Sequence, residues 1–247
     1  MRKLAGAALI LIMGQAWAQD RDPIATDRPD FTESALVVPH RMIQIETGFT
    51  YQWSRQAFVL SGPEALFRIS TGARSEIRIG IPDMNWQRSG GTTSNGFSDT
   101  YVGSKIQLGP LKNGDDLALI PAITLPSRDS NFSSGSVDPE LKVCWGRDLN
   151  HGWGVTAMAY GLYTTDTQGR LFVYQQTVSF GRELSERSAV FLEYAGTFSG
   201  RTTPDHVIHF GFLYQPTVDT QFDIHAGFST NGPDRQPFIA AGYSVRY

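Results

Sequence analysis

The stretch RMIQIETGFTYQW (41–53) alternates between two kinds of side chain almost without exception. One parity is apolar or aromatic and runs from Ile43 to Trp53, while the other is polar or small and includes Gln44 and Glu46. Because successive side chains of a strand point to opposite faces, this pattern predicts a strand with one apolar and one polar face. The apolar face contacts either a protein core or lipid.

The same alternation recurs along the rest of the chain, and no helical periodicity follows the polar, Pro-containing stretch that precedes residue 41. The spacing is typical of antiparallel hairpins and predicts about twelve strands. We expect them near 41–53, 57–71, 75–82, 97–108, 116–125, 137–146, 153–163, 171–181, 187–198, 206–215, 218–229 and 237–247.

The connections between these strands differ at the two ends. One set is mostly short: TGAR, GPLKNGDD, RDLNHG, RELSER and QPTVD. The other set is mostly longer and rich in Gly, Ser, Asn and Thr: DMNWQRSGGTTSNG, SRDSNFSSGSVDP, TTDTQGR, GRTTPD and STNGPDRQP. Short turns at one end and longer loops at the other are typical of outer-membrane barrels, in which the short turns lie in the periplasm.

Alternation alone does not separate a membrane barrel from a soluble β-sandwich or a lipocalin-like barrel, since both of these also alternate. Aromatic side chains on the apolar parity gather at the strand ends, where membrane barrels carry two girdles. Tyr51, Trp53, Phe198 and Phe228 belong to the loop end, and Trp145, Phe180, Tyr214, Tyr243 and Tyr247 to the short-turn end.

The first residues predict export. Residues 1–18 read as a signal peptide, with a basic start, an apolar stretch and an AWA cleavage site ending at Ala18. Residues 19–40 then form a periplasmic or lumen-plugging segment, and residues 41–247 form the barrel. The chain holds a single cysteine, Cys144, so no internal disulfide is expected, and we interpret it as a small strand side chain.

These signs together predict an all-β fold, a closed antiparallel transmembrane β-barrel with up-and-down topology in the outer membrane of a Gram-negative bacterium. Closure is required because strands in lipid cannot leave unpaired edges. Gly242, Val245 and Tyr247 match a Gly-x-x-apolar-x-aromatic ending that resembles the signal read by the barrel-assembly machinery. The expected partners are therefore outer-membrane lipids and that machinery.

Charged and imidazole side chains occupy the polar parity, which faces the lumen of such a barrel. One hypothesis is a selectivity lining that steers solutes, and the other is a set of ion pairs that fills the lumen. Eight strands are filled by side chains and sixteen leave a water channel, so about twelve strands leave both hypotheses open. The lumen-lining candidates are Glu46, Arg68, Glu76, Arg78, Asp99, Lys105, Glu140, Lys142, Glu193, His209, Asp223 and His225.

His209, Asp223 and His225 share the lumen face of neighbouring predicted strands. A His beside an Asp is half of a hydrolase triad, but no Ser stands in a fitting arrangement, and a lumen hydrogen-bond cluster explains the residues better. No ligand spacing indicates a metal, and no motif indicates a cofactor. The net charge of −3 gives no basic excess for nucleic acid.

The lead into the first strand carries a family resemblance. TDRPDFTES and VVPHRMIQIETGF resemble the opening of the outer-membrane transporter family labelled "meta-pathway of phenol degradation". LFRISTGARSEIRIGIP and GFSDTYVGSKIQL resemble its next hairpin and fourth strand, although His40 and Arg41 stand where many members place a Gly. The resemblance implies an outer-membrane barrel that takes up small molecules, aromatic ones among them, and it provides no catalytic residues to carry over to this sequence. The alternatives are a lipid-modifying barrel enzyme and a non-transporting structural or adhesive barrel.

Overall fold

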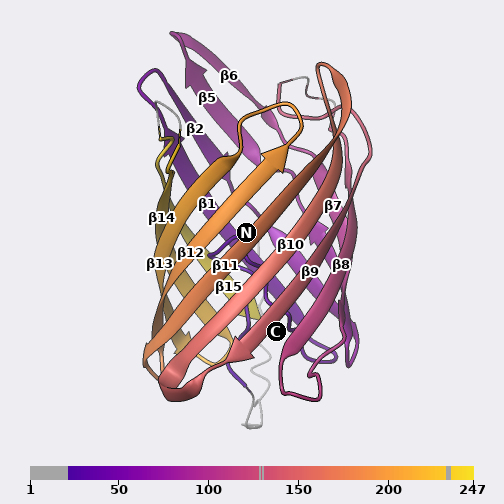
Figure 1. Cartoon of the computed structure of the whole chain (residues 1–247), viewed down its shortest axis with the longest axis vertical. Helices are drawn as coiled ribbons and strands as arrows, with labels where there is room; N and C mark the ends of the chain where they lie inside the picture. Colours follow the sequence, from indigo (N-terminus) through magenta and orange to yellow (C-terminus); the bar gives the residue numbers. More distant parts are fainter. Residues whose placement is uncertain (1–21, 128, 130, 232–234) are drawn as a thin grey trace, which may run out of the picture.

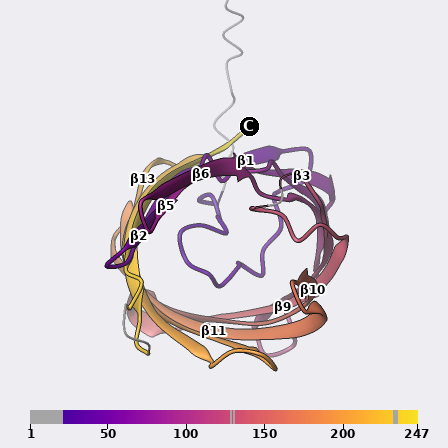
Figure 2. The same ribbon diagram turned by 90° about the horizontal axis from the view of Figure 1, so that it is seen from above.

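The chain folds into one upright β-barrel, as the computed structural model shows from the side and from above (Figures 1 and 2). The structure describes residues 22–127, 129, 131–231 and 235–247. The predicted signal peptide, residues 1–18, lies outside the described residues. Within the described residues, no helix has the length and apolar character needed to cross a membrane.

The described residues form fifteen strand segments in one sheet, and these combine into twelve barrel strands because three barrel strands are each interrupted once. β2 continues as β3, β4 as β5, and β6 as β7. The bounds are β1 (Ile43–Trp53), β2 (Ala57–Gly62), β3 (Leu66–Gly72), β4 (Ser75–Gly80), β5 (Met84–Ser89), β6 (Thr92–Phe97), β7 (Thr100–Gln107), β8 (Asp116–Leu125), β9 (Asp138–Asp148), β10 (Trp153–Asp166), β11 (Gly169–Ser185), β12 (Ser188–Ser199), β13 (Asp205–Thr217), β14 (Thr220–Ser229) and β15 (Phe238–Arg246).

The barrel closes between its first and last strands, as predicted. β1 pairs antiparallel with β15 in a continuous register from Gln44 opposite Arg246 to Gln52 opposite Phe238. Every other neighbouring pair is also antiparallel and follows the chain order. The prediction of a closed, twelve-stranded up-and-down barrel is therefore confirmed.

The two faces of the barrel are the reverse of those of a soluble protein. Side chains of the polar parity point inward and are buried, and Arg68 and Lys105 are both 0% exposed. Side chains of the apolar parity point outward, where Ile79 is 37% and Phe222 48% exposed. A sandwich would bury its apolar faces against each other. The apolar face of β1 is instead part of the outer surface, which excludes the sandwich.

Two of the longer loops expected from the sequence are tight hairpins. DMNWQRSGGTTSNG (83–96) is mostly the β5–β6 hairpin, whose turn residues Gly90 and Gly91 have φ of 56° and 87°. Positive φ at both turn residues suits a two-residue turn whose twist matches the strands, and Gly adopts it without strain. TTDTQGR (164–170) likewise continues β10 and β11. The polar composition indicated loops, but backbone pairing extends these strands beyond the apolar band.

The three interruptions lie side by side in the wall, toward the loop end. They fall at residues 63–65, 81–83 and 98–99, between segments that would otherwise be continuous. Pro63 and Pro82 stand in two of them. Because proline has no backbone N–H, it cannot donate to the sheet ladder and favours a break at these positions.

Candidate functional site

The barrel lumen is occupied by the stretch before β1, residues 22–42, which we call the lumen segment. Figure 2 shows it as a loop inside the ring of strands. It begins beside the short β13–β14 turn, where the Ile24 amide donates to the Val218 carbonyl at 2.7 Å. It returns along β4, where the Val38 amide donates to Glu76 at 2.7 Å, and then enters β1. The structure thus places this segment in the lumen.

Asp27 of the lumen segment is the shared counterion of three buried cations. Its carboxylate lies 3.2 Å from Arg68 Nη1, 2.5 Å from Arg78 Nη1 and 2.8 Å from Lys105 Nζ. These cations stand on β3, β4 and β7. Buried charges are stable only when they are paired, so the segment and the wall depend on each other for neutralisation.

Two carboxylates of the wall complete this cluster. Glu46 on β1 and Glu76 on β4 lie 2.9 Å and 2.8 Å from the Arg68 guanidinium. Glu76 also lies 3.0 Å from Arg78 Nη1. All four residues were predicted to face the lumen, and the structure brings them into direct contact with one another.

Glu33 makes a second charged contact between the lumen segment and the wall. It accepts from Arg78 Nη2 at 2.7 Å and pairs with Lys142 on β9. Lys142 also lies 3.5 Å from Glu140, which accepts a hydrogen bond from the Tyr160 hydroxyl at 2.9 Å. The inward charges of β9 therefore serve to hold the segment.

Arg28 anchors the segment to the opposite side of the barrel. Its guanidinium lies 2.7 Å from Glu64 and 3.4 Å from Asp223. It packs against the backbone of β1 and β15 at two glycines: a Cβ at Gly48 would lie 2.4 Å from Arg28 Nη2, and one at Gly242 would lie 2.4 Å from Arg28 Nε. Only glycine leaves room for the guanidinium at these two positions.

The predicted cluster of imidazoles exists and also contacts the lumen segment. His209 Nε2 lies 2.8 Å from His225 Nδ1, and His209 Nδ1 lies 2.7 Å from Glu193. Glu193 accepts from the amides of Phe31 and Thr32 at 2.9 Å and 2.8 Å. Asp223 is less central than expected, since its carboxylate is 3.8 Å from His225 Nε2.

Asp99 and Lys105 lie on the same barrel strand but contact different partners. Lys105 reaches Asp27, whereas the Asp99 carboxylate accepts from the amides of Ser127 and Ser134 at 2.8 Å and 3.1 Å. Asp99 therefore holds the loop after β8. Cys144 is buried on the lumen side in a small apolar cluster that includes Met158, which fits its interpretation as a small strand side chain.

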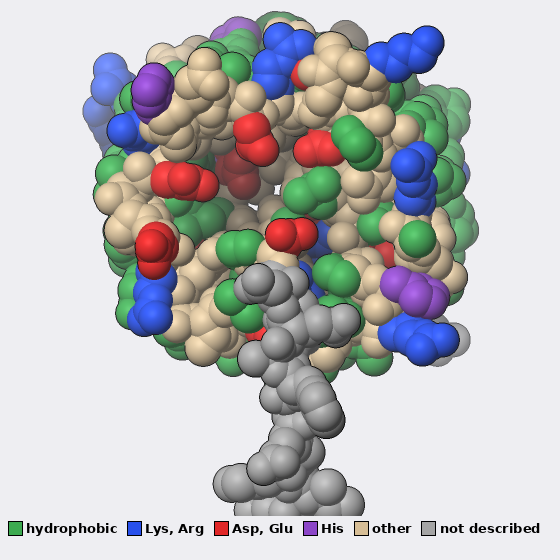
Figure 3. All heavy atoms as spheres, turned by 90° about the horizontal axis from the view of Figure 1, so that it is seen from below, with side chains coloured by type: hydrophobic (Ala, Val, Ile, Leu, Met, Phe, Trp, Pro, Cys, Tyr) green, Lys and Arg blue, Asp and Glu red, His purple; other side chains and the backbone are tan. Residues whose placement is uncertain are grey.

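A cavity of about 300 Å³ remains on the loop side of the lumen segment. Phe31, His225 and Phe238 line it together with Asp205 and with uncharged polar side chains such as Gln175 and Thr197. From the short-turn end, the barrel face is hollowed at its centre and acidic side chains gather around the hollow (Figure 3). The segment therefore narrows the lumen without filling it.

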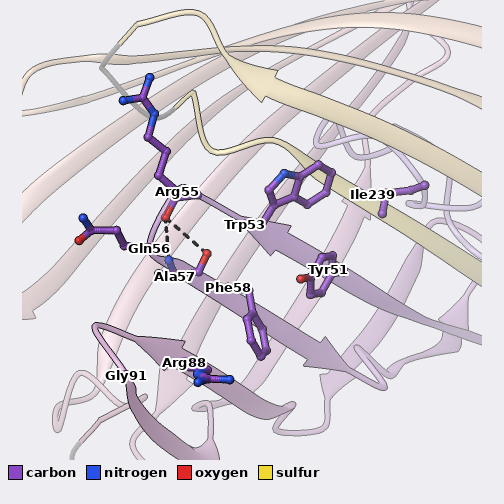
Figure 4. A pocket seen from close by; sticks show the side chains of 10 residues that line it. Tyr51, Trp53, Arg55, Gln56, Ala57, Phe58, Arg88, Gly91 and Ile239 are labelled. Atoms are coloured by element: carbon purple, nitrogen blue, oxygen red, sulfur yellow. Dashed lines mark hydrogen bonds between the residues drawn. The ribbon is translucent and has the colours of Figure 1, made fainter.

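A larger depression, about 650 Å³, lies on the outer face of β1, β2 and β5 rather than in the lumen. Figure 4 shows Tyr51, Trp53 and Phe58 standing along it, with Arg88 beside Phe58. The Tyr51 and Trp53 rings are stacked at 5.6 Å. These rings form part of the aromatic girdle at the loop end, so we do not place the functional site there.

The sequence did not reveal which residues of the segment make these contacts. Asp27, Arg28 and Glu33 carry most of its charge pairs, and none has the strand parity that identified the wall residues. The available signal was their position within TDRPDFTES, which combines charges with Pro in a stretch without periodicity. Among the described residues, no group of three or more His, Cys, Asp or Glu side chains is arranged to hold a metal ion.

A closed antiparallel barrel with an apolar outside and a charged inside that is narrowed by its own N-terminal segment defines an outer-membrane-type β-barrel. The chain belongs to the family described as "Putative MetA-pathway of phenol degradation", whose model matches residues 26–247. This confirms the resemblance seen in the sequence. No curated protein sequence matches the chain.

Several solved barrels share the fold at low sequence identity. The COG4313 outer membrane channel from Pseudomonas putida F1 is 10% identical, with a TM-score of 0.65 over 85% of this chain and 97% of that one. The NanC porin is 11% identical, with a TM-score of 0.60 over 81% and 98%. The KdgM porin is 10% identical, with a TM-score of 0.55 over 81% and 98%. At this identity the similarity establishes the architecture.

The glycine that makes room for Arg28 gives a testable prediction. We expect Gly242→Ala to lower the free energy of unfolding by about 1–3 kcal/mol, because the new methyl group overlaps Arg28 and Asp223. Urea titration of the refolded protein in detergent measures this change. Gly181→Ala on β11 is the matched control, since a Cβ there meets no atom of the described residues within 4 Å. Equal effects at the two positions would contradict the close packing of Arg28 against Gly242.

Gly242 also belongs to the predicted assembly signal with Val245 and Tyr247. In the structure Gly242 faces the lumen, while Val245 and Tyr247 lie on the outer face. The role of the three residues in assembly stays a prediction.

Proposed function

We propose that the protein is an outer-membrane channel that passes small molecules by diffusion. The observation that carries this proposal is a closed barrel of polar interior in which a cavity of about 300 Å³ stays open beside the lumen segment. An interior meant only for stability would be filled by side chains, as in eight-stranded barrels. The apolar outer face and its aromatic ends suit contact with outer-membrane lipids.

The cavity lining favours small solutes of mixed character. Phe31 and Phe238 offer aromatic faces with their ring centroids 5.9 Å apart, and Gln175, Thr197 and Ser229 offer hydrogen-bonding groups. Asp205 adds a carboxylate acceptor to the lining. Such a lining suits a compact molecule without negative charge that has an aromatic or apolar body and one or two hydroxyl groups to donate. The family description, which refers to phenol degradation, is consistent with that class.

The arrangement of the imidazoles argues against a lipid-modifying enzyme. Such an enzyme needs a nucleophile bonded to its base. In the part of the chain that the structure describes, the hydrogen-bond partners of His209 and His225 are Glu193, Arg28 and each other. His206, on the outer face, bonds to the Tyr194 hydroxyl at 2.7 Å. None of these partners is a Ser, Thr or Cys.

Conductance in a planar lipid bilayer tests the proposal. We expect the full mature protein to give a small, steady conductance, and a variant lacking residues 23–38 to give a conductance several times larger. The deletion is compatible with the topology because the lumen segment starts and ends at the same end of the barrel. Arg201→Gln is the control, since Arg201 pairs with Asp166 at the loop end, outside the lumen, and should leave conductance unchanged.

Two results would overturn the channel proposal. One is a correctly folded deletion variant that conducts no more than bare lipid, which would favour a structural or adhesive barrel. The other is hydrolysis of phospholipid by the purified protein. Liposome swelling with sugars, amino acids and phenolic compounds then distinguishes the solute classes.

A further inference from the structure

Residues 28–32 of the lumen segment are held at both ends by one chain of hydrogen bonds, which runs between inward-facing side chains of the barrel wall. Arg28 Nη2 lies 3.3 Å from His225 Nε2, and His225 Nδ1 lies 2.8 Å from His209 Nε2. His209 Nδ1 then lies 2.7 Å from Glu193 Oε2. Glu193 in turn accepts from the amides of Phe31 and Thr32, which closes the loop back to the segment.

Because Arg28 can only donate, it determines which ring nitrogen of His225 and of His209 carries the proton. A guanidinium only donates, so His225 Nε2 must be the acceptor and the His225 proton must lie on Nδ1. That proton is donated to His209 Nε2, which leaves the His209 proton on Nδ1, where it is donated to Glu193. Glu193 accepts four hydrogen bonds from described residues and acts as a carboxylate. Both imidazoles are therefore neutral in the clamped state.

An added proton has no place in this arrangement. On His225 Nε2 it would set a donor against the Arg28 donor and a positive charge beside a positive charge. On His209 Nε2 it would face the His225 Nδ1 proton, unless the His225 proton moved to Nε2 and met Arg28 instead. Each alternative breaks a link of the clamp.

Asp223 is positioned to accept a hydrogen bond from a protonated His225. It lies 3.8 Å from His225 Nε2, and its buried Oδ2 atom has no hydrogen-bond partner among the described residues. A protonated His225 would therefore turn to Asp223 and compete with Arg28, which lies 3.4 Å from the same carboxylate. Arg28 would lose its imidazole partner and share its carboxylate partner at the same time.

The other groups around the imidazole pair are aromatic rings and carboxyl groups, and Asp205 lines the same cavity as His225. Phe31, Phe191 and Phe238 surround His209, with ring centroids 4.8, 5.0 and 5.3 Å away. Asp30 is a second carboxyl group near Glu193, and Glu64 holds Arg28 from the β2–β3 connection. Protonation of Glu193, Asp223 or Glu64 removes an acceptor from the clamp and weakens it too. Protonation of Asp30 acts in the opposite direction, because it relieves the repulsion between Asp30 and Glu193.

We propose that His209 and His225 form an acid-sensitive latch that holds residues 28–32 in the lumen at neutral pH and releases them as the pH falls. Ordinary imidazoles take up a proton between pH 8 and 5, and the clamped state excludes that proton. Release is therefore favoured by acid. The latch concerns the position of the segment, so it stands or falls independently of whether the barrel conducts.

The test follows the exposure of a cysteine in the clamped stretch. Thr32→Cys places a thiol at a buried position and keeps the hydrogen bond that the backbone amide of residue 32 donates to Glu193. The variant is made in a Cys144→Ala background, which removes the native thiol. The rate of maleimide labelling is compared with that of the same protein carrying His209→Gln and His225→Gln. An amide side chain accepts and donates like the neutral imidazole but does not titrate in this range.

We expect the labelling rate of the histidine-containing protein, relative to the glutamine variant at the same pH, to rise roughly 30-fold between pH 7.5 and pH 5 for one imidazole of ordinary proton affinity. Comparison at equal pH cancels the intrinsic pH dependence of the thiol. His206→Gln is the matched control, because His206 lies on the same strand but on the outer face and should leave the rise intact. A ratio that does not change with pH overturns the latch.

A second measurement does not depend on the glutamine variant folding. Nitrogen-15 NMR of labelled histidine at pH 7.5 reports which ring nitrogen carries the proton. We expect Nδ1 to be protonated and Nε2 bare in both His209 and His225. Protonation of Nε2 in either ring would contradict the hydrogen-bond chain and with it the proposal.

Discussion

Asp27→Asn is expected to lower the free energy of unfolding by about 3–5 kcal/mol, the usual cost of breaking a buried ion pair by removing one partner. Asp27 is shared by Arg68, Arg78 and Lys105, all of which are buried. The asparagine keeps the shape of the side chain but leaves one negative charge too few. Urea titration of the protein refolded in detergent measures the loss.

The control for this prediction makes the same chemical change on the surface. Asp166 pairs with Arg201 at the loop end, where both side chains are partly exposed. Exposed ion pairs contribute about 0–1 kcal/mol, so Asp166→Asn should fall in that range. Adding Lys105→Met to Asp27→Asn should recover part of the loss, because Asp27 is the carboxylate that Lys105 contacts directly. A loss at Asp27 no larger than that at Asp166 would contradict the central role of this carboxylate.

Ile79→Arg is expected to impair insertion by about 2–4 kcal/mol, the cost of an arginine near the middle of the membrane on the lipid face of a barrel. Ile79 lies on β4, points outward, and pairs with Phe67 and Val102 on the two neighbouring strands. Refolding into lipid vesicles, followed by the heat-modifiable mobility shift in gel electrophoresis, measures the folded fraction.

The matched control is Gln175→Arg, which adds the same charge to the lumen side. Gln175 lines the inner cavity, where a guanidinium meets water and polar groups rather than lipid. We expect a change below about 1 kcal/mol there, as for a substitution away from packed contacts. Arg78→Ile is unsuitable as the control, because Arg78 contacts Asp27, Glu33 and Glu76 and its loss would be costly in its own right. Equal effects of Ile79→Arg and Gln175→Arg would mean that the two faces are misassigned.

The lumen segment is held by charge and hydrogen bonds much more than by apolar packing. Its contacts include the Asp27 and Glu33 ion pairs on one side and the Arg28 and Glu193 contacts on the other. Such contacts have discrete partners, so a single proton or substitution changes them locally. An apolar plug would not respond to a change in pH, because it holds no group that takes up a proton. This difference is what lets a segment narrow a lumen and still be released.

The order of residues along the chain is enough to establish the barrel and the direction of its side chains. Strict alternation in stretches such as 41–53 fixes which residues share a face, because a strand has a period of two residues. That period places Arg68, Glu76 and Arg78 on one face and Ile79 on the other, and the aromatic strand ends together with the export signal identify the first face as the lumen. It also leads to the closed, twelve-stranded topology, since lipid forbids an unpaired edge.

The contacts of the inward residues, in contrast, follow only from the way the whole chain is folded. The lumen segment has no periodicity, so nothing in its sequence indicated that Asp27 would meet cations from three different strands. The strand pattern likewise places Asp99 and Lys105 on one face of the same predicted strand, but Asp99 binds the loop after β8 and Lys105 binds the lumen segment. Alternation specifies a face, whereas partners across a lumen depend on the shear and closure of the whole barrel and on the path of a segment without regular structure.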